Sequence, residues 1–147
     1  MSGEIKLEVL NDIADSLEIG LICFYHKITG EVESYPQTIE DIGDVDGFWE
    51  EVTDKIEENY SDFVRIECMN SSEAFDIMED FAVQINEVSV KSRFLNALSH
   101  KKPFQNFNHT LHYYPALREE WFKFKRLRYI EYVKDVLTGA GLIEDNN

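Results

Sequence analysis

The side chains with the best spacing for metal chemistry are two histidines. His109 and His112 lie three residues apart on a predicted helix, so they share a face and could grip a metal ion together. Their neighbours Asn108 and Tyr113 supply no carboxylate or thiolate ligand. We therefore interpret them as ordinary helix histidines, and we predict no metal site and no cofactor.

The segment Asp44–Gly47 (DVDG) is similar to part of a calcium-binding loop. If Gly47 is aligned with the required glycine of an EF-hand, Ile42 falls at the first ligand position and Thr53 at the position of the bidentate glutamate. Neither side chain can replace the missing carboxylate. This comparison excludes an EF-hand.

The sequence shows no activated nucleophile. It has no G-x-S-x-G motif, no glycine-rich phosphate loop, and neither Cys23 nor Cys68 stands in an electropositive context. Both cysteines lie in apolar, strand-like runs and could form a disulfide only if their strands were adjacent. No catalytic residue is predicted, and an enzyme would need a pocket of convergent polar groups that the sequence does not reveal.

The N-terminus and the hydropathy pattern indicate where in the cell the protein is expected. The first residues lack the basic start and apolar stretch of a secretion signal, and no run approaches the ~18 apolar residues of a membrane span. We expect a cytoplasmic protein that does not engage a membrane, with its cysteines reduced.

Charge is distributed unevenly along the chain, whose net charge is −15. Residues 1–90 hold four Lys or Arg against 23 Asp or Glu, a net charge of −19, whereas residues 91–147 hold ten against six, a net charge of +4. The acidic part is either a solvated surface that keeps the protein soluble or a face that steers a cationic partner.

Basic and aromatic residues alternate between residues 101 and 132, a pattern that can neutralise phosphates and stack bases. The candidate polyanion contacts are Lys101, Lys102, Arg118, Lys123, Lys125, Arg126 and Arg128. However, the rings of Phe104, Phe107, Trp121 and Phe124 occur at core spacing on their predicted helices. We therefore expect these rings to be interior, which makes nucleic-acid binding the alternative function and not the first choice.

Periodicity and turn signals give the order of elements. We predict a helix over 5–17, a hairpin of strands 21–27 and 30–36 turning at Thr29–Gly30, an acidic loop over 39–47, a helix over 48–60, a strand over 62–69, and then four helices. Asn70 with Glu73 indicates a capping box at the first of these, and Pro103 and Pro115 suit the first turns of the last two.

This order predicts the α+β class, with a small three-stranded antiparallel sheet packed by an N-terminal helix and a C-terminal array of about four helices. We expect a single domain over residues 1–147, with an acidic α/β part at about 1–69 and a helical part at about 70–143.

The helical part resembles uncharacterised protein family 0158, a bacterial group. The residues that carry the resemblance span roughly 60–137 and are Met78, Glu79, Asp80, Phe81, Leu95, Ala97, Leu98, Lys102, Pro103, Phe104, Phe107, Pro115, Arg118, Trp121 and Phe124. The resemblance implies a bacterial intracellular protein and brings no catalytic residue, cofactor or substrate. Family members often carry basic residues where this chain has Gln105, Asn106 and Asn108, which argues against polyanion binding.

Arg118 and Asp80 are the charged residues of interest among them. We favour a salt bridge between Arg118 and Asp80 that joins two helices, the alternative being an anion contact by Arg118. Taken together, the sequence predicts a non-catalytic binding or regulatory module that recognises a protein partner or its own basic half in a homodimer.

Overall fold

A computed structural model describes residues 5–143. The chain forms two compact units, of which the first holds the residues up to Cys68 and those from Tyr129 onward, and the second holds Met69–Arg128. The predicted α+β class is confirmed. Over residues 5–143, no helix combines the length and the apolar character needed to cross a membrane. That the chain forms a single domain stays a prediction.

The sheet of the first unit has three antiparallel strands in the order β2-β1-β3. The strands are β1 (Leu21–His26), β2 (Val32–Pro36) and β3 (Phe63–Ile66). Gly30 lies in the turn between β1 and β2 with a φ of 77°, a backbone conformation that glycine adopts without steric cost. In the register, Phe24 of β1 stands opposite Glu33 on one side and Arg65 on the other.

One face of this sheet packs against α1 (Leu7–Glu18) and the C-terminal part of the last helix. Its core consists of Leu10, Ile13, Ala14, Leu17, Cys23, Val64, Ile66, Ile130, Val133 and Leu137. The predicted alternation of β3 is confirmed, because Val64 and Ile66 lie in this core whereas Phe63 lies on the opposite face.

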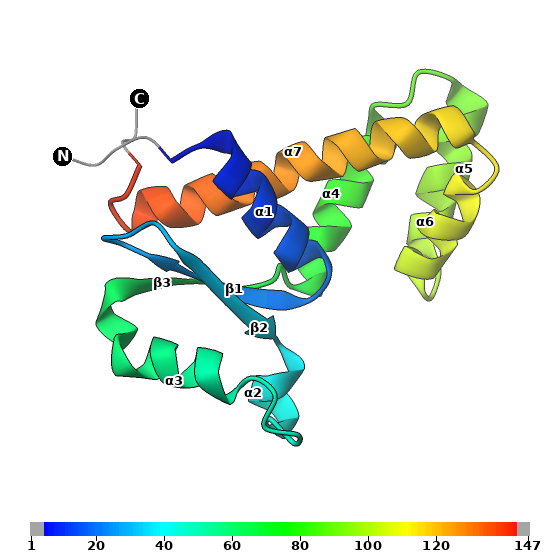
Figure 1. Ribbon diagram of the computed structural model, residues 1–147. Helices are drawn as coiled ribbons and strands as arrows, with labels where there is room; N and C mark the ends of the chain where they lie inside the picture. The colour runs from blue at the N-terminus through cyan, green and yellow to red at the C-terminus, as the bar shows by residue number, and fades with distance from the viewer. Residues whose placement is uncertain (1–4, 144–147) are drawn as a thin grey trace. The chain divides into compact units, whose positions relative to one another are not determined.

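The opposite face is covered by α2 (Thr38–Ile42) and α3 (Glu50–Glu58), followed by a single 3-10 turn at Tyr60–Asp62. Figure 1 shows α3 on the other side of the sheet from α1. The core here consists of Ile22, Phe24, Tyr35, Ile56 and Phe63, with Ile39, Trp49 and Val52 packed on it. The loop predicted over 39–47 is thus partly wrong, because its first residues belong to α2.

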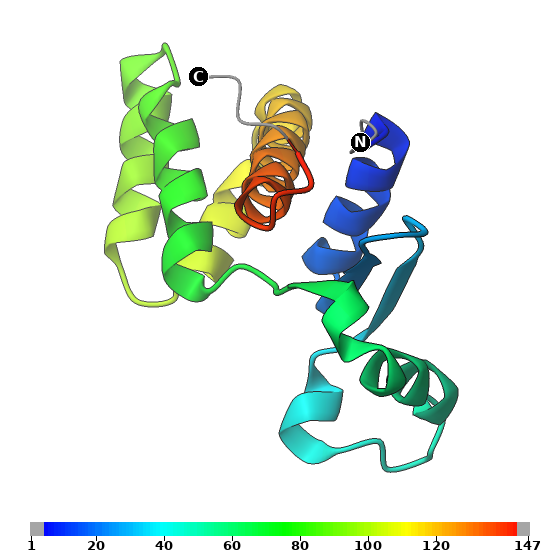
Figure 2. The same cartoon turned by 90° about the vertical axis from the view of Figure 1, so that its left-hand side faces the viewer.

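The second unit is helical, as predicted. Its elements are α4 (Ser71–Val83), α5 (Val88–Ser99), α6 (Pro103–Leu111) and the part of α7 (Pro115–Gly139) that precedes Tyr129. The capping box is confirmed, since the Glu73 backbone N–H donates to Asn70 Oδ1 at 2.8 Å and the Asn70 N–H donates to Glu73 Oε1 at 3.1 Å. Figure 2 shows α4 and α5 side by side.

Aromatic rings fill the core of the second unit. Phe107 and Trp121 are 0% and 2% exposed, with ring centroids 4.9 Å apart. Phe81 contacts both rings, and Phe94 lies 5.3 Å from Phe107. Phe104 and Phe124 pack partly buried against this cluster. The interior placement is therefore confirmed for Phe107 and Trp121 and is partial for Phe104 and Phe124, and each fully buried ring contributes about 2–3 kcal/mol of hydrophobic stabilisation.

Candidate protein-binding surface

The helix α2 is tied to the sheet through one carboxylate. Arg65 Nη1 and Nη2 donate to the two oxygens of Glu40 at 2.7 and 2.6 Å, and Tyr35 Oη donates to Glu40 Oε2 at 2.6 Å. Hydrogen bonds from Arg65 are the main cause that lowers the pKa of Glu40 to about 2. Burial, followed by the hydrogen bond to Glu40, raises the pKa of Tyr35 to about 12.

Arg65 itself is held on two further sides. Its Nε donates to Glu67 Oε1 at 2.9 Å, and its guanidinium carbon lies 5.6 Å from the centre of the Phe24 ring. Charge-assisted bonds of this forked geometry are stronger than those between neutral groups. The network therefore fixes the position of α2, and with it the point at which the loop between α2 and α3 begins.

The loop between α2 and α3 is closed by a hydrogen bond between two of its own residues. The Trp49 backbone N–H donates to Asp44 Oδ2 at 2.8 Å, just before the first residue of α3. Gly43 and Gly47 have φ angles of 82° and 68°, which allow the chain to turn on either side of Val45. Trp49 then packs on the sheet face, so both ends of the loop are held by the first unit's core.

Three large apolar side chains of this segment lie in solvent. Ile42, Val45 and Phe48 are 74%, 81% and 82% exposed. Phe48 contacts the Trp49 ring edge-on, with a centroid distance of 6.0 Å. We call these three side chains, with the surrounding carboxylates of Asp41, Asp46, Glu50 and Glu51, the loop surface.

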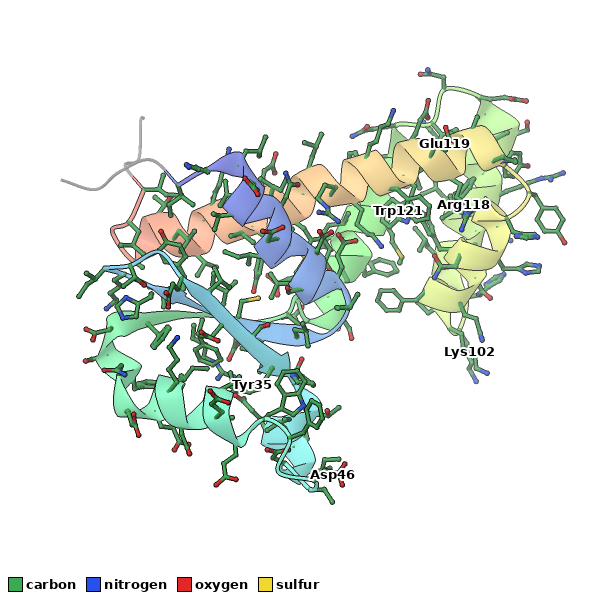
Figure 3. The ribbon with its side chains drawn as sticks, viewed as in Figure 1. Tyr35, Asp46, Lys102, Arg118, Glu119 and Trp121 are labelled. Carbon is green, nitrogen blue, oxygen red and sulfur yellow. The ribbon has the colours of Figure 1, made fainter. Side chains whose placement is uncertain are left out.

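The charge around the loop surface is strongly negative. Residues 38–58 contain nine Asp or Glu and a single basic residue, Lys55. The Nζ of Lys55 is bound by Glu33 at 2.9 Å and Glu31 at 3.3 Å, both on the strand side of the unit. Figure 3 shows Asp46 at the tip of the loop, away from Tyr35 at the sheet. The surface thus combines apolar contact area with negative charge.

The described residues also bear on the metal and thiol chemistry considered from the sequence. In the part of the chain that the structure describes, no three His, Cys, Asp or Glu side chains form a metal-binding group. Cys23 and Cys68 are free thiols, so the possible disulfide is absent. Burial raises the pKa of both thiols, that of Cys23 to about 11, which keeps them protonated near neutrality.

The structure gives Asp80 a different partner from the predicted one. Arg128 Nη1 donates to Asp80 Oδ2 at 2.7 Å. Arg118 instead lies over the Phe122 ring, with its guanidinium carbon 5.1 Å from the ring centre. The predicted salt bridge between Arg118 and Asp80 is therefore wrong, because Arg118 lies ten residues, or about 15 Å of helix, before the arginine that reaches the carboxylate.

The candidate polyanion contacts do not form one stripe. Lys101 and Lys102 lie in the turn before α6, whereas Arg118 lies near the start of α7 (Figure 3). On α7, Lys123 is rotated by about 140° from Arg118, since a helix has 3.6 residues per turn. Arg126 and Arg128 are partly buried, as is Lys125, whose Nζ lies over the Trp121 and Phe122 rings.

The placement of the rings also bears on nucleic-acid binding. Phe107 and Trp121 are buried and cannot stack on bases, whereas Phe122, 47% exposed, has Arg118 and Lys125 over its ring. Nucleic-acid binding stays a prediction, and the buried rings do not supply the base stacking that the alternation of basic and aromatic residues suggested.

The two histidines that could share a metal ion, His109 and His112, each lie edge-on to the Tyr113 ring.

Sequence reasoning missed Ile42, Val45 and Phe48 as candidate contacts. They lie three residues apart between acids and glycines, a spacing that also fits a short amphipathic helix whose apolar face is buried. Ile39 packs inward and Ile42 does not, although both belong to α2 and lie three residues apart.

Comparison with known proteins gives a family. Residues 7–142 match the model of the Uncharacterised protein family (UPF0158). A UPF0158 protein of Pseudomonas aeruginosa is 30% identical over 82 residues, which is 56% of this chain and 50% of the relative, so the chain matches about half the length of that curated protein. No solved structure matches. Because the family model spans nearly the whole chain, the protein belongs to the Uncharacterised protein family (UPF0158).

Proposed function

We propose that this protein is a non-catalytic binding module that docks a protein partner through the loop surface. The observation that carries the proposal is the exposure of Ile42, Val45 and Phe48 on a segment held at one end by the Arg65–Glu40 contact and at the other by the packing of Trp49. Scattered exposed apolar residues are ordinary on proteins, but three at intervals of three residues, from the end of α2 into the following loop, provide an apolar contact area.

The partner is a basic, amphipathic protein segment. Its apolar side chains would cover Ile42, Val45 and Phe48, and its Lys or Arg residues would meet Asp41, Asp46, Glu50 and Glu51. Carboxylates around an apolar centre attract such a segment and repel acidic competitors, so charge sets its association rate and its specificity. This choice of partner favours a heterologous protein over the weakly basic residues 91–147 of a second copy.

The test uses defined peptides and the fluorescence of the protein's two tryptophans, of which Trp49 adjoins the loop. A peptide with Leu and Lys arranged to give one apolar helical face is titrated, with a scrambled peptide of equal composition and a Leu/Glu peptide as comparisons. We expect micromolar binding of the first peptide alone, weakened at least tenfold by 0.5 M salt. Equal binding of the scrambled peptide would show that only bulk charge is recognised.

Matched variants locate the contact. The triple variant Ile42→Ser, Val45→Ser, Phe48→Ser should weaken binding at least tenfold. The control Ile19→Ser, Ile28→Ser removes apolar side chains that are 77% and 78% exposed elsewhere in the same unit, and it should bind normally. Unchanged binding by the triple variant refutes the proposal. Self-association in sedimentation, abolished by the triple variant, would identify a second copy as the occupant instead.

A further inference from the structure

The segment from Val88 to Arg118 contains no acidic residue, although the chain has 29. These 31 residues include five Lys or Arg and three of the four histidines. The segment comprises all of α5 and α6 and the start of α7. The two central helices of the second unit are thus a region of positive and donor-rich character in a protein of net charge −15.

A groove of about 390 Å³ lies between α5 and α6. Arg93 and Asn96 line it from one face of α5, and His100 follows directly after the end of that helix, seven residues from Arg93. His109 lines it from α6, and Tyr113 stands at its edge, 66% exposed. No carboxylate is among its lining residues.

Hydrogen bonds hold the groove in shape. Asn106 Nδ2 donates to the carbonyl oxygens of Ala97 and Lys101 at 3.2 and 2.9 Å, which joins α6 to the end of α5. Arg93 Nη1 donates to Tyr114 Oη at 2.9 Å, which orients the guanidinium. Within residues 5–143, Arg93 makes no ion pair, so its remaining donors are available to a ligand.

We propose that this groove binds a small organic phosphate. The planar fork of Arg93 matches the oxygens of a phosphate, and the side chains of Asn96, His100 and His109 supply further donors from both helices. The Tyr113 ring, with His109 lying edge-on at 5.5 Å, offers a face for a planar organic group attached to the phosphate. Its volume falls in the range of small-molecule sites.

The same region favours a small ligand over a long polyanion. The basic residues Lys123, Lys125, Arg126 and Arg128 of α7 lie at widely different angles around the helix, since each residue is rotated by about 100° from the one before. Lys101 and Lys102, exposed in the turn that closes α5 and α6, strengthen the positive potential at the groove without lining it. A phosphate on a free nucleotide and a terminal phosphate on an oligonucleotide share this chemistry, and the test separates them.

The test is isothermal titration of the full chain at low salt with four probes: inorganic phosphate, a purine nucleoside monophosphate, the nucleoside without phosphate, and a single-stranded RNA of ten nucleotides. We expect saturable binding of the monophosphate, weaker binding of inorganic phosphate and none of the nucleoside. The variant Arg93→Gln should bind the monophosphate at least tenfold more weakly. The melting temperature of this variant should stay close to that of the parent protein.

Controls make the result specific to the groove. Lys91→Gln removes a cation from the same helix outside the groove lining and should bind normally, and His109→Gln should weaken binding about threefold to tenfold. No saturable binding of any phosphate at millimolar concentration overturns the proposal. The proposal is also overturned if the RNA binds tightly, if Arg93→Gln leaves that binding unchanged, and if the double variant Lys101→Gln, Lys102→Gln abolishes it. The loop-surface triple variant should bind the monophosphate normally, so this proposal stands or falls separately from the proposed function.

Discussion

Arg65 on β3 binds both oxygens of Glu40 on α2, at 2.6 and 2.7 Å, across a sequence separation of 25 residues. The side chains are about one-third exposed, 30% for Arg65 and 33% for Glu40. This contact holds a five-residue helix that has no buried residue of its own. Such a short helix is not stable alone, so its position depends on the tertiary contact.

We expect Glu40→Gln to destabilise the protein by about 1–2 kcal/mol, a value reduced from the full pKa effect because solvent screens the pair. The folded-state pKa of Glu40 is about 2 and its ordinary value 4.5. Because the folded pKa is the lower one, the stabilisation is complete above about pH 4.5 and is lost as pH falls through 2. Urea unfolding between pH 2 and 7 measures it. The exposed Glu57→Gln is the control, and an identical pH dependence in both variants would contradict the prediction.

Asp80 should couple to Arg128 and not to Arg118. Double-mutant cycles with Asp80→Asn, Arg128→Gln and Arg118→Gln measure the two coupling energies from urea unfolding. For a partly exposed pair we expect about 0.5–1 kcal/mol between Asp80 and Arg128, and a value near zero between Asp80 and Arg118. A larger coupling to Arg118 would restore the pairing expected from the sequence.

Phe107 is fully buried among other rings, so Phe107→Ala should cost about 3–5 kcal/mol of unfolding free energy. Phe122→Ala, at a half-exposed ring on α7, should cost about 1 kcal/mol or less, mainly from lost contacts with Arg118 and Lys125. Thermal and denaturant unfolding compare the two. Similar losses of unfolding free energy in the two variants would contradict the burial of Phe107 in the core of the second unit.

The two thiols should differ in reactivity. Cys23 is 0% exposed, whereas Cys68 is partly exposed with its Sγ 3.2 Å from the Leu21 carbonyl oxygen. With iodoacetamide at pH 8, mass spectrometry should show Cys68 modified at least tenfold faster than Cys23, and both modified rapidly in 8 M urea. Cys68→Ser should leave a native protein that is nearly inert to the reagent. Resistance of both residues until a reductant is added would indicate a disulfide.

Local sequence was sufficient for most elements of this protein. Helix signals such as the Asn70–Glu73 capping box and the prolines at 103 and 115 depend on residues within one turn, and each begins a helix as expected. The alternation of Val64 and Ile66 with Phe63 gave the two faces of β3. The aromatic spacing gave the interior of the helical unit, because burial follows the periodicity of a helix.

The sequence alone established an α+β chain with an acidic first part, a ring-filled helical part and no recognisable catalytic motif. Three features required the tertiary structure: the contact of Glu40 with Arg65, the contact of Asp80 with Arg128, and the groove that Arg93, His100 and His109 line together. The physical reason is that each of these contacts joins different elements of the fold. Helix and strand periodicity fixes the face on which a residue lies, whereas the packing of whole elements fixes which residue it meets.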